Sequence, residues 1–397
     1  MTIFYLLIGL LVLQGLISLR DGFRYLAYVR RSVAASLPDF TPHVAIIAPC
    51  KGLDESMHHY LQSLFELDYP HYQIIFSVES SSDVALAEIT HWQARYPDIS
   101  ARCVVAGRSY DRGQKVHNLL AAVADISPEV EALVFVDSDI LLPRHWLRAL
   151  VAPLTDTAVG ATTGYRWFIP ADHRFVTLLR SSWNGSVATT LGEHNNNFAW
   201  GGSMAILRTT FERIEVRRHW QGTVSDDYAL TRAVKEAGLY VKFVPTCLVP
   251  SLGSCTLREL LEFTTRQIII TRVYSGGLWK LLLISNLLFN LVFFLGGVFA
   301  LSELIQGHHC LPLILIVIVY LLTVWKGYLR VQAVKLILVN YQKEIVGARW
   351  GYYLLAPVVS LIYFYNLIGS IFTNRITWRG ITYELRSANK TVILPEN

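Results

Sequence analysis

Charged residues are scarce in this sequence. Only 16% of its 397 residues are Asp, Glu, Lys or Arg, against about a quarter in ordinary soluble domains, whereas 53% are hydrophobic. The net charge of +5 is modest and the basic residues form no long run, which disfavours a nucleic-acid-binding protein. This balance is typical of a protein that lies partly in lipid, with a positive face held against anionic phospholipid.

Paired cysteines are also lacking. The five cysteines form no C-x-x-C pair, and their odd number argues against a disulfide framework. They are Cys50, Cys103, Cys247, Cys255 and Cys310. We therefore expect reduced thiols. The doublets His58–His59 and His308–His309 have no partners at ligand spacing, so the sequence indicates no zinc site.

Long uncharged runs, in contrast, are present. Residues 2–19 contain no charge and are long enough to cross a bilayer core of about 30 Å. No basic residue precedes this run, and Arg20, Arg24, Arg30 and Arg31 follow it. Because positive flanks stay in the cytoplasm, we expect a retained anchor over 1–20 and a cytoplasmic domain after it.

Three more uncharged stretches, 281–302, 304–325 and 350–374, predict a transmembrane region over 281–374 and a multi-pass integral membrane protein. Residues 350–374 form either a further span or a re-entrant hairpin, because Pro357 and several polar residues interrupt them. Alternation of spans places the tail over 375–397 outside, whereas its basic residues favour the inside.

Short runs rich in Val and Ile alternate with helical patterns between residues 42 and 255. The runs, each ending in Gly or polar residues, are HVAIIAPCKG, YQIIFSVES, ARCVVAG and ALVFVDSD, and the helical patterns lie at 54–66, 82–95 and 114–125. This alternation predicts an α/β domain over 42–255 with a mostly parallel sheet. In such sheets ligands bind beyond the carboxyl ends of the strands.

Asp137 and Asp139 follow the run ALVFV at such a strand end. Two carboxylates one residue apart can share a Mg²⁺ or Mn²⁺ ion, which prefers oxygen ligands and binds a diphosphate through its remaining positions. The alternative is a solvated loop after the strand, in which two aspartates one residue apart are also common. The position directly after a buried strand favours the metal site.

Two later segments carry glycines and further acids. A Gly pair in 193–208 precedes a strand of small residues, which fits either close approach of a ligand to the backbone or a tight turn. In 223–238, Ser225 or Asp226 can cap a helix that Gly238 ends. One cap is sufficient, so Asp227 remains available to take a proton from an attacking hydroxyl.

Residues 256–280, just before a predicted span, combine apolar Leu, Phe and Ile with basic residues in an amphipathic pattern. This pattern is typical of an amphipathic helix that lies in the membrane interface. Its Arg266 and Arg272 either contact lipid headgroups or bind a diphosphate, for which a guanidinium offers paired donors.

The order of these features resembles a known family. An N-terminal anchor, an acid after the second strand, Asp-x-Asp, an acidic pair before Tyr228, an Arg-rich interfacial helix and RITWRGITYEL (375–385) follow one another over most of the chain. This resembles inverting glycosyltransferases of the family 2 type, most closely the ceramide glucosyltransferases of family 21. The resemblance implies a cytosolic, Rossmann-like glycosyltransferase A-type domain, a UDP-sugar donor, a lipid acceptor and Mg²⁺ or Mn²⁺.

The resemblance also implies roles on the donor side. Glu79 and Asp83 stand where the family contacts uridine, and Lys115 in GQKVHNLL matches a nucleotide-contacting lysine. Asp137 and Asp139 correspond to the residues that hold the metal and the sugar diphosphate.

On the acceptor side, the resemblance implies that Asp227 is the general base. The residues implied to contact the acceptor are Gly201, Gly202, Ser203 and Asp226.

One family motif departs from its usual form. The family commonly has Gln or Arg, two residues, then Arg-Trp, but QIII follows Arg266 here. Arg272 and Tyr274 are the candidates to substitute. The missing Trp disfavours a processive polysaccharide synthase.

The sequence therefore predicts a membrane-bound hexosyltransferase of glycolipid and sphingolipid metabolism. It would transfer a hexose, glucose by family expectation, to ceramide or a similar lipid hydroxyl on the cytosolic leaflet. Alternative acceptors are diacylglycerol, a polyprenyl phosphate or a polysaccharide. A non-catalytic membrane scaffold is the alternative from another class, and the acids at every strand end argue against it. The oligomeric state stays open.

Overall fold

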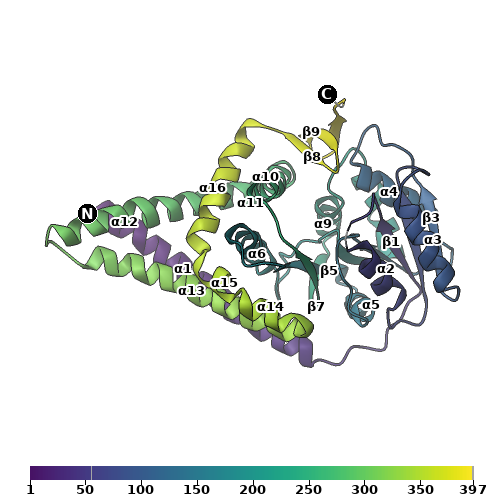
Figure 1. Cartoon of the computed structure of the whole chain (residues 1–397), viewed down its shortest axis with the longest axis horizontal. Coiled ribbons are helices and arrows are strands. Elements are labelled where there is room, and N and C mark those ends of the chain that lie inside the picture. The colour runs from purple at the N-terminus through teal and green to yellow at the C-terminus, as the bar shows by residue number, and fades with distance from the viewer. Residues whose placement is uncertain (55, 396–397) are drawn as a thin grey trace. The chain divides into compact units, whose positions relative to one another are not determined.

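The computed structural model describes residues 1–54 and 56–395 (Figure 1). The chain divides into two compact units, each built from three separate segments. Unit 1 comprises Met1–Arg31, Phe168–Thr190 and Leu252–Asn374, and unit 2 comprises Ser32–Trp167, Leu191–Ser251 and Arg375–Asn397. Residue 55, within the helical pattern predicted at 54–66, and residues 396–397 of the predicted tail lie outside the described residues.

A seven-stranded sheet forms the centre of unit 2, in the order β3-β2-β1-β4-β6-β5-β7. Its strands are β1 (Val44–Pro49), β2 (Tyr72–Val78), β3 (Ser100–Val105), β4 (Ala132–Val136), β5 (Val159–Pro170), β6 (Ser203–Leu207) and β7 (Tyr240–Gly253). Strands β3, β2, β1 and β4 are parallel to one another, and β6 pairs antiparallel with both β4 and β5. The prediction of a mostly parallel α/β sheet is confirmed.

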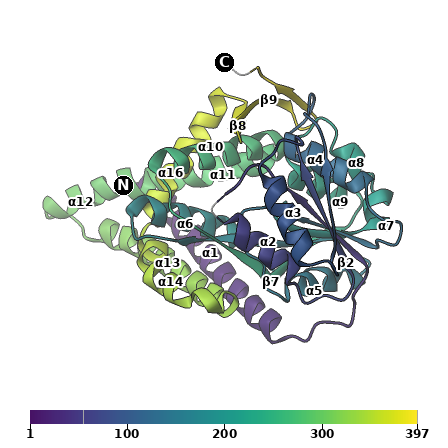
Figure 2. The ribbon, with the colours of Figure 1, turned by 45° about the vertical axis from the view of Figure 1, so that its right-hand side comes forward.

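Helices on both faces of this sheet explain the continuous apolar strands. They are α2 (Met57–Phe65), α3 (Ala85–Arg95), α4 (Gln114–Ala124), α5 (Trp146–Val151), α7 (Arg208–Arg213), α8 (Val216–His219) and α9 (Asp226–Glu236). Successive side chains of a strand point to opposite faces. Accordingly, Ile46 joins the core that contains α2 and α3, and Ile47 joins the core that contains α4 and α9. Figure 2 shows these helices around the sheet.

The segment predicted as a tail also belongs to unit 2 and forms a small antiparallel sheet, the C-terminal sheet. Its strands are β8 (Arg375–Trp378), β9 (Ile381–Ser387) and β10 (Lys390–Ile393). The side chains of Ile376, Tyr383 and Leu385 are buried. The C-terminal sheet is therefore packed in place by apolar contacts.

Unit 1 is helical. Its helices are α1 (Thr2–Ala34, which continues just past the unit boundary), α6 (Phe175–Ala188), α10 (Leu257–Tyr274), α11 (Gly276–Asn290), α12 (Gly296–Ile305), α13 (Leu311–Ile337), α14 (Gln342–Gly347), α15 (Arg349–Leu354) and α16 (Ala356–Phe372). The predicted interfacial helix over 256–280 corresponds to α10 and the start of α11. A capping box of Thr256 and Glu259 starts α10, which packs against α16.

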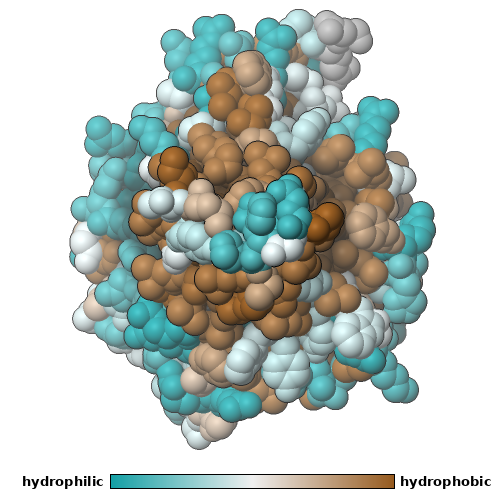
Figure 3. Space-filling model, turned by 90° about the vertical axis from the view of Figure 1, so that its left-hand side faces the viewer, coloured by the Kyte–Doolittle hydropathy of each residue, from teal (hydrophilic) through white to brown (hydrophobic). Residues whose placement is uncertain are grey.

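Within the described residues, three helical stretches are long and apolar enough to cross a membrane: Thr2–Ala34, Gly276–Ile305 and Leu311–Ile337. Their outward side chains are apolar, for example Leu6 and Leu10 on α1, and Figure 3 shows apolar side chains spread over this end of unit 1. Exposed apolar surface of this extent is typical of helices that contact lipid or another protein. Helix α13 continues past residue 325, where the predicted span ends. In this added part, Lys326 Nζ donates a hydrogen bond of 2.6 Å to Ser18 Oγ on α1.

All five cysteines are free thiols, as expected from their number and spacing.

Candidate active site

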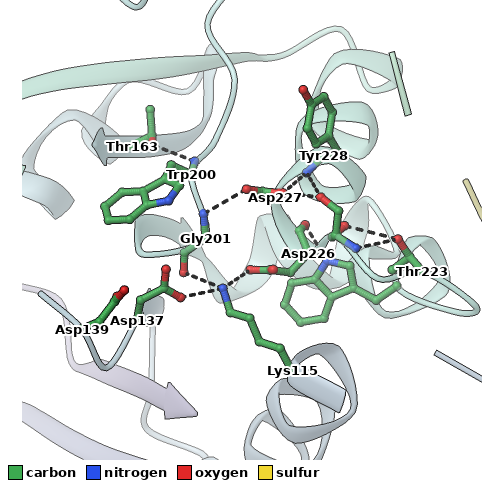
Figure 4. A network of polar contacts seen from close by, with 12 residues as sticks. Lys115, Asp137, Asp139, Thr163, Trp200, Gly201, Thr223, Asp226, Asp227 and Tyr228 are labelled. Carbon is green, nitrogen blue, oxygen red and sulfur yellow. Dashed lines mark hydrogen bonds and ion pairs between the residues drawn. The ribbon is translucent and has the colours of Figure 1, made fainter. Parts of the chain in front are cut away.

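Lys115 is the centre of a charged cluster in unit 2 (Figure 4). Its Nζ atom lies 2.8 Å from Asp137 Oδ1 and 3.3 Å from Asp226 Oδ2, and it donates to the carbonyl oxygen of Gly201 at 3.3 Å. These four residues come from the start of α4, the end of β4, the start of α9 and the loop before β6. Residues predicted separately from strand ends and helix starts therefore lie together.

The start of α4 is fixed by side-chain hydrogen bonds. Gln114, its first residue, accepts a hydrogen bond from the N–H of Ser109 at 2.9 Å and donates to the carbonyl oxygen of Gly107 at 2.8 Å. Gly113 precedes the helix and donates its N–H to the carbonyl oxygen of Thr223 at 2.9 Å. These bonds hold Lys115 toward the end of β4.

Arg166 on β5 is the main site residue that the sequence reasoning missed. Its Nη2 atom lies 2.9 Å from Asp137 Oδ2, and its Nη1 atom lies 2.9 Å from Asp139 Oδ2. The guanidinium also stands over the ring of Trp200, 4.9 Å from its centroid, and the side chain is only 13% exposed. A buried arginine needs partners. The single charge within the apolar strand VGATTGYRWFIP was thus a usable signal.

Charge pairing decides the protonation of the cluster. Burial opposes the charge of Asp137, but Lys115 and Arg166 outweigh burial, so the pKa of Asp137 lies below its ordinary value. Burial likewise opposes the charge of Lys115, yet Asp137 and Asp226 hold the pKa of Lys115 above its ordinary value. Both groups are therefore ionised at neutral pH.

The two acids at the start of α9 have different surroundings. Ser225 caps the helix, as one of the two predicted caps. Asp226 is buried, and this burial raises its pKa to about 6; Lys115 opposes the rise and Asp227 adds to it. Asp227 is partly exposed: its Oδ1 atom accepts from the N–H of Tyr228 at 2.7 Å and from the Ser225 hydroxyl, and its Oδ2 atom lies 3.5 Å from the Gly201 nitrogen. Asp227 is the acid that a substrate can reach.

The raised pKa of Asp226 predicts a pH-dependent stability. The carboxyl has an ordinary pKa of 3.8 in the unfolded chain and about 6 in the folded one. Well below pH 3.8 the carboxyl is protonated in both states, so it costs nothing. Between about pH 4 and pH 6 the unfolded chain ionises while the buried carboxyl stays mostly protonated, so stability falls, by up to roughly 3 kcal/mol once the folded group ionises as well. In Asp226→Asn this loss should disappear, so the free energy of unfolding of the variant should increase relative to that of wild type as the pH rises.

Thermal unfolding midpoints of wild type and Asp226→Asn between pH 4.5 and 8 measure this difference. Two parallel curves over that range would show that Asp226 does not titrate as described.

The Gly pair lies against the acids without room for a side chain. A Cβ atom on Gly201 would stand 2.3 Å from Asp226 Oδ2 and 2.7 Å from Lys115 Nζ, and one on Gly202 would stand 2.7 Å from Asp137 Oδ2. Next to them, Ser203 is fully buried and its hydroxyl accepts from Trp146 Nε1 at 2.9 Å. Its hydroxyl therefore holds β6 to α5, away from solvent.

Gly201→Ala is expected to destabilise the protein by about 1–3 kcal/mol, because the added methyl group must displace a buried ion pair. The same substitution at Gly192, whose Cβ atom would meet only the His194 ring at 3.5 Å, is the matched control and should change little. Thermal unfolding in detergent measures both. Equal midpoints for the two variants would contradict the close packing at Gly201.

Glu79 and Asp83 lie beyond the end of β2, beside the loop that follows β1. Glu79 Oε2 is 3.0 Å from Lys51 Nζ. Asp83 Oδ1 accepts from the N–H of Gly52 at 3.0 Å and from the N–H of Ala85 at 2.9 Å, so it also supports the start of α3. Contact of these acids with a nucleotide stays a prediction.

The two arginines of the predicted interfacial helix lie on α10, in unit 1. Arg272 Nη2 donates to the carbonyl oxygen of Thr373 at 3.2 Å and also to Asn374 Oδ1. The Arg266 guanidinium stands 5.8 Å from the ring centroid of Phe263. A diphosphate contact by either arginine stays a prediction.

The donor atoms of Asp137 and Asp139 suit a divalent cation. Arg166 Nη2 lies 2.9 Å from Asp137 Oδ2 and 3.2 Å from Asp139 Oδ1, so oxygens of both carboxylates converge on one positive group. Across residues 1–54 and 56–395, no group of three or more His, Cys, Asp or Glu is arranged to hold a metal. Two carboxylates, with the other ligands from a diphosphate and water, match the way Mg²⁺ is usually held.

The chain matches glycosyl transferase family 21 over residues 10–391 and belongs to that family, as the motifs predicted.

Curated relatives match over shorter stretches. The ceramide glucosyltransferase of Komagataella phaffii (strain GS115) is 35% identical over 88 residues, which are 21% of this chain and 17% of that enzyme. Ceramide glucosyltransferase 3 of Caenorhabditis elegans is 28% identical over 81 residues, which are 20% of this chain and 18% of that enzyme. The matches thus span less than a fifth of these relatives.

The solved structures to which this chain is similar include the mannosyltransferase PcManGT of Pyrobaculum calidifontis in complex with GDP-Man and Mn²⁺. The TM-score is 0.49, and the identity is 16% over 92% of this chain and 98% of that one. Another is the glucosyl-3-phosphoglycerate synthase of Mycobacterium tuberculosis in complex with Mn²⁺ and UDP-glucose, with a TM-score of 0.38 and 14% identity over 63% of this chain and 83% of that one.

Proposed function

We propose that this protein is a membrane-bound inverting glycosyltransferase that transfers a hexose, by family expectation glucose, from a UDP-sugar to the hydroxyl of ceramide or a similar lipid. The membership of family 21 and the names of the curated relatives support this activity. The single observation that carries it is the meeting of Asp137, Asp226 and Asp227 around Gly201 and Gly202, with Asp139 joined to Asp137 through Arg166.

The donor side of this site neutralises a leaving diphosphate. Asp137 and Asp139 would hold Mg²⁺ or Mn²⁺, which supplies positive charge to the diphosphate when bound. Lys115 and Arg166 add two cations beside these acids. Their charges stabilise the negative charge that develops on the departing phosphate oxygen, because they are already oriented in a mostly buried site.

The acceptor side provides a base. Two hydrogen-bond donors hold Asp227 Oδ1, whereas the bond described for Oδ2 is the long one of 3.5 Å from the Gly201 nitrogen. Asp227 Oδ2 is thus the oxygen that takes the proton of the acceptor hydroxyl while the hydroxyl oxygen attacks the anomeric carbon. One displacement inverts the anomeric centre, and in-line placement of the two substrates is the remaining requirement.

A lipid acceptor accounts for the helices of unit 1. Three stretches long and apolar enough to span a membrane would keep the enzyme where the acceptor headgroup lies, with its charged cluster on the cytosolic side. A lipid hydroxyl at that surface does not have to be extracted before it reacts.

Purified protein in detergent with Mn²⁺, a panel of UDP-sugars and a panel of lipids tests this function, with products read by mass spectrometry. A glycosylated ceramide from UDP-glucose is the expected product. Transfer only to diacylglycerol or a polyprenyl phosphate would mean that this lipid, and not ceramide, is the acceptor. Nucleotide binding without any product would contradict the enzymatic function.

A further inference from the structure

The turn between β8 and β9 holds an arginine in a disfavoured backbone conformation. Arg379 and Gly380 have φ angles of 50° and 83°, the left-handed pair of a two-residue hairpin turn. Asn, Asp or Gly usually fills the first of these positions, because a larger side chain is strained there. The arginine therefore carries a cost that a glycine would avoid, which indicates a role outside the turn.

The C-terminal sheet sets this turn beside the charged cluster. The Gln114 N–H donates to Tyr383 Oη at 3.2 Å, and Thr391 Oγ1 donates to the carbonyl oxygen of Gly222 at 2.7 Å. Gly222 itself lies so close that a Cβ atom there would be 2.1 Å from the Asn389 carbonyl oxygen. The sheet thus rests on the start of α4 and on the segment that leads into α9, which carry Lys115 and Asp226.

Arg379 faces the loop that follows β1. Its Nη2 atom lies 2.9 Å from Asp54 Oδ2, and its Nη1 atom donates to Asp54 Oδ1 at 3.3 Å. The hydrogen bond that Arg379 donates to Asp54 raises the pKa of Arg379, and the charges of Asp54, Asp139 and Asp137 add to the rise. The guanidinium therefore lies in the electric field of the Asp-x-Asp carboxylates.

The cluster has no positive charge to spare for a diphosphate. It combines four acids, Asp137, Asp139, Asp226 and Asp227, with the two cations Lys115 and Arg166, and a bound Mg²⁺ or Mn²⁺ would balance the two remaining negative charges. Both cations are only 13% exposed and already paired with the acids, so releasing either one would leave a buried carboxylate without its partner.

The Arg379–Asp54 ion pair is more exposed than Lys115 and Arg166. The Arg379 side chain is 42% exposed and the Asp54 side chain 39% exposed. Exposed ion pairs contribute little to stability, so Arg379 can exchange Asp54 for another anion at little cost.

We propose that Arg379 is a donor-binding residue that leaves Asp54 and contacts the diphosphate of the UDP-sugar. The inference rests on the proposed function, because it assigns a residue to the donor side of the same site. A guanidinium pairs with two phosphate oxygens as it does with the two oxygens of Asp54.

Calorimetric titration of the full-length protein in detergent with Mn²⁺ tests this assignment, with UDP and UMP as probes. Arg379→Gly removes the guanidinium and gives the turn its favoured residue, so the fold is retained. We expect UDP affinity to fall by about tenfold or more and UMP affinity by about twofold, since UMP lacks the second phosphate. Arg379→Lys should recover part of the UDP affinity.

Two companion variants separate a phosphate contact from a structural ion pair. Asp54→Ala frees Arg379 and should leave UDP affinity equal to or above that of wild type. Arg386→Ala, on the same sheet with its Nη2 atom 3.7 Å from Glu384 Oε2, should bind UDP as wild type does.

Three results would overturn the proposal. In the first, Arg379→Gly binds UDP as wild type does; in the second, it loses UDP and UMP affinity equally. In the third, Asp54→Ala loses as much UDP affinity as Arg379→Gly, so that only the ion pair matters. Each of these leaves the proposed function intact if wild type binds UDP and transfers sugar, whereas wild-type protein without UDP affinity would remove both.

Discussion

Asp227→Asn is expected to reduce sugar transfer by about a thousandfold, because a positioned general base commonly contributes 10² to 10⁴ in rate. The amide keeps an oxygen for the Tyr228 N–H, now at 2.7 Å from Asp227 Oδ1, so the first turn of α9 should stay folded. Asp227 makes no contact with Asp137 or Asp139 among the bonds described for it, so we expect UDP affinity within about threefold of wild type.

Product formation by mass spectrometry and UDP titration on the same preparation measure both effects. Glu236→Gln, a substitution of an exposed acid at the other end of α9, is the matched control and should leave transfer unchanged. Normal turnover by Asp227→Asn would mean that another group removes the proton, and Asp226 would be the next candidate.

In Asp139→Ala, Mn²⁺ is expected to lose most of its effect on donor binding. Asp139 is one of the two acids whose oxygens converge on Arg166, so its loss leaves one carboxylate for the cation. Metal charge on a phosphoryl group is worth several kcal/mol, so donor affinity with Mn²⁺ should fall by about tenfold or more. In EDTA the affinity should equal or exceed that of wild type, because one negative charge has been removed and Arg166 is partly released.

Calorimetric titration with UDP-glucose, once in Mn²⁺ and once in EDTA, gives the ratio of the donor affinity with the metal to the donor affinity without it. Asp98→Ala, which removes an exposed acid just before β3, is the control for a simple change in net charge. An unchanged ratio in Asp139→Ala would place the cation away from the Asp-x-Asp pair.

The sequence was informative where the chemistry lies at the ends of regular elements. Asp137 follows an unbroken apolar strand and Asp227 starts a helix, so local patterns located both, whereas Lys115 was found through the family resemblance. Parallel strands bring their carboxyl ends to one edge of a sheet, which is why these separate residues meet. The free cysteines and the family followed from equally local features.

Arg166 was missed because its place depends on strand order. β5 reaches the site only because β6 lies between it and β4, and both pairings are antiparallel. No local spacing encodes that order. The lone charge in an apolar strand marked Arg166 as unusual, but its partners lie 27 and 29 positions earlier in the chain.

Long-range pairing also hid the role of the last segment. Arg379 and Asp54 are 325 positions apart, and Tyr383 reaches Gln114 across 269 positions. The residues over 375–397 looked like a tail because they follow the last apolar helix. The alternation of apolar and polar residues in ITYELRS, which forms β9, was the available sign of a strand.

The division of the chain sets an order of events during synthesis. The helices of unit 1 leave the ribosome before Arg375–Asn397, which completes unit 2. Tyr383 and Arg379 are thus synthesised only after the long apolar helices. A polypeptide released before residue 375 would contain all three helical stretches that are apolar enough to cross a membrane, but it would lack the C-terminal sheet that lies beside the charged cluster.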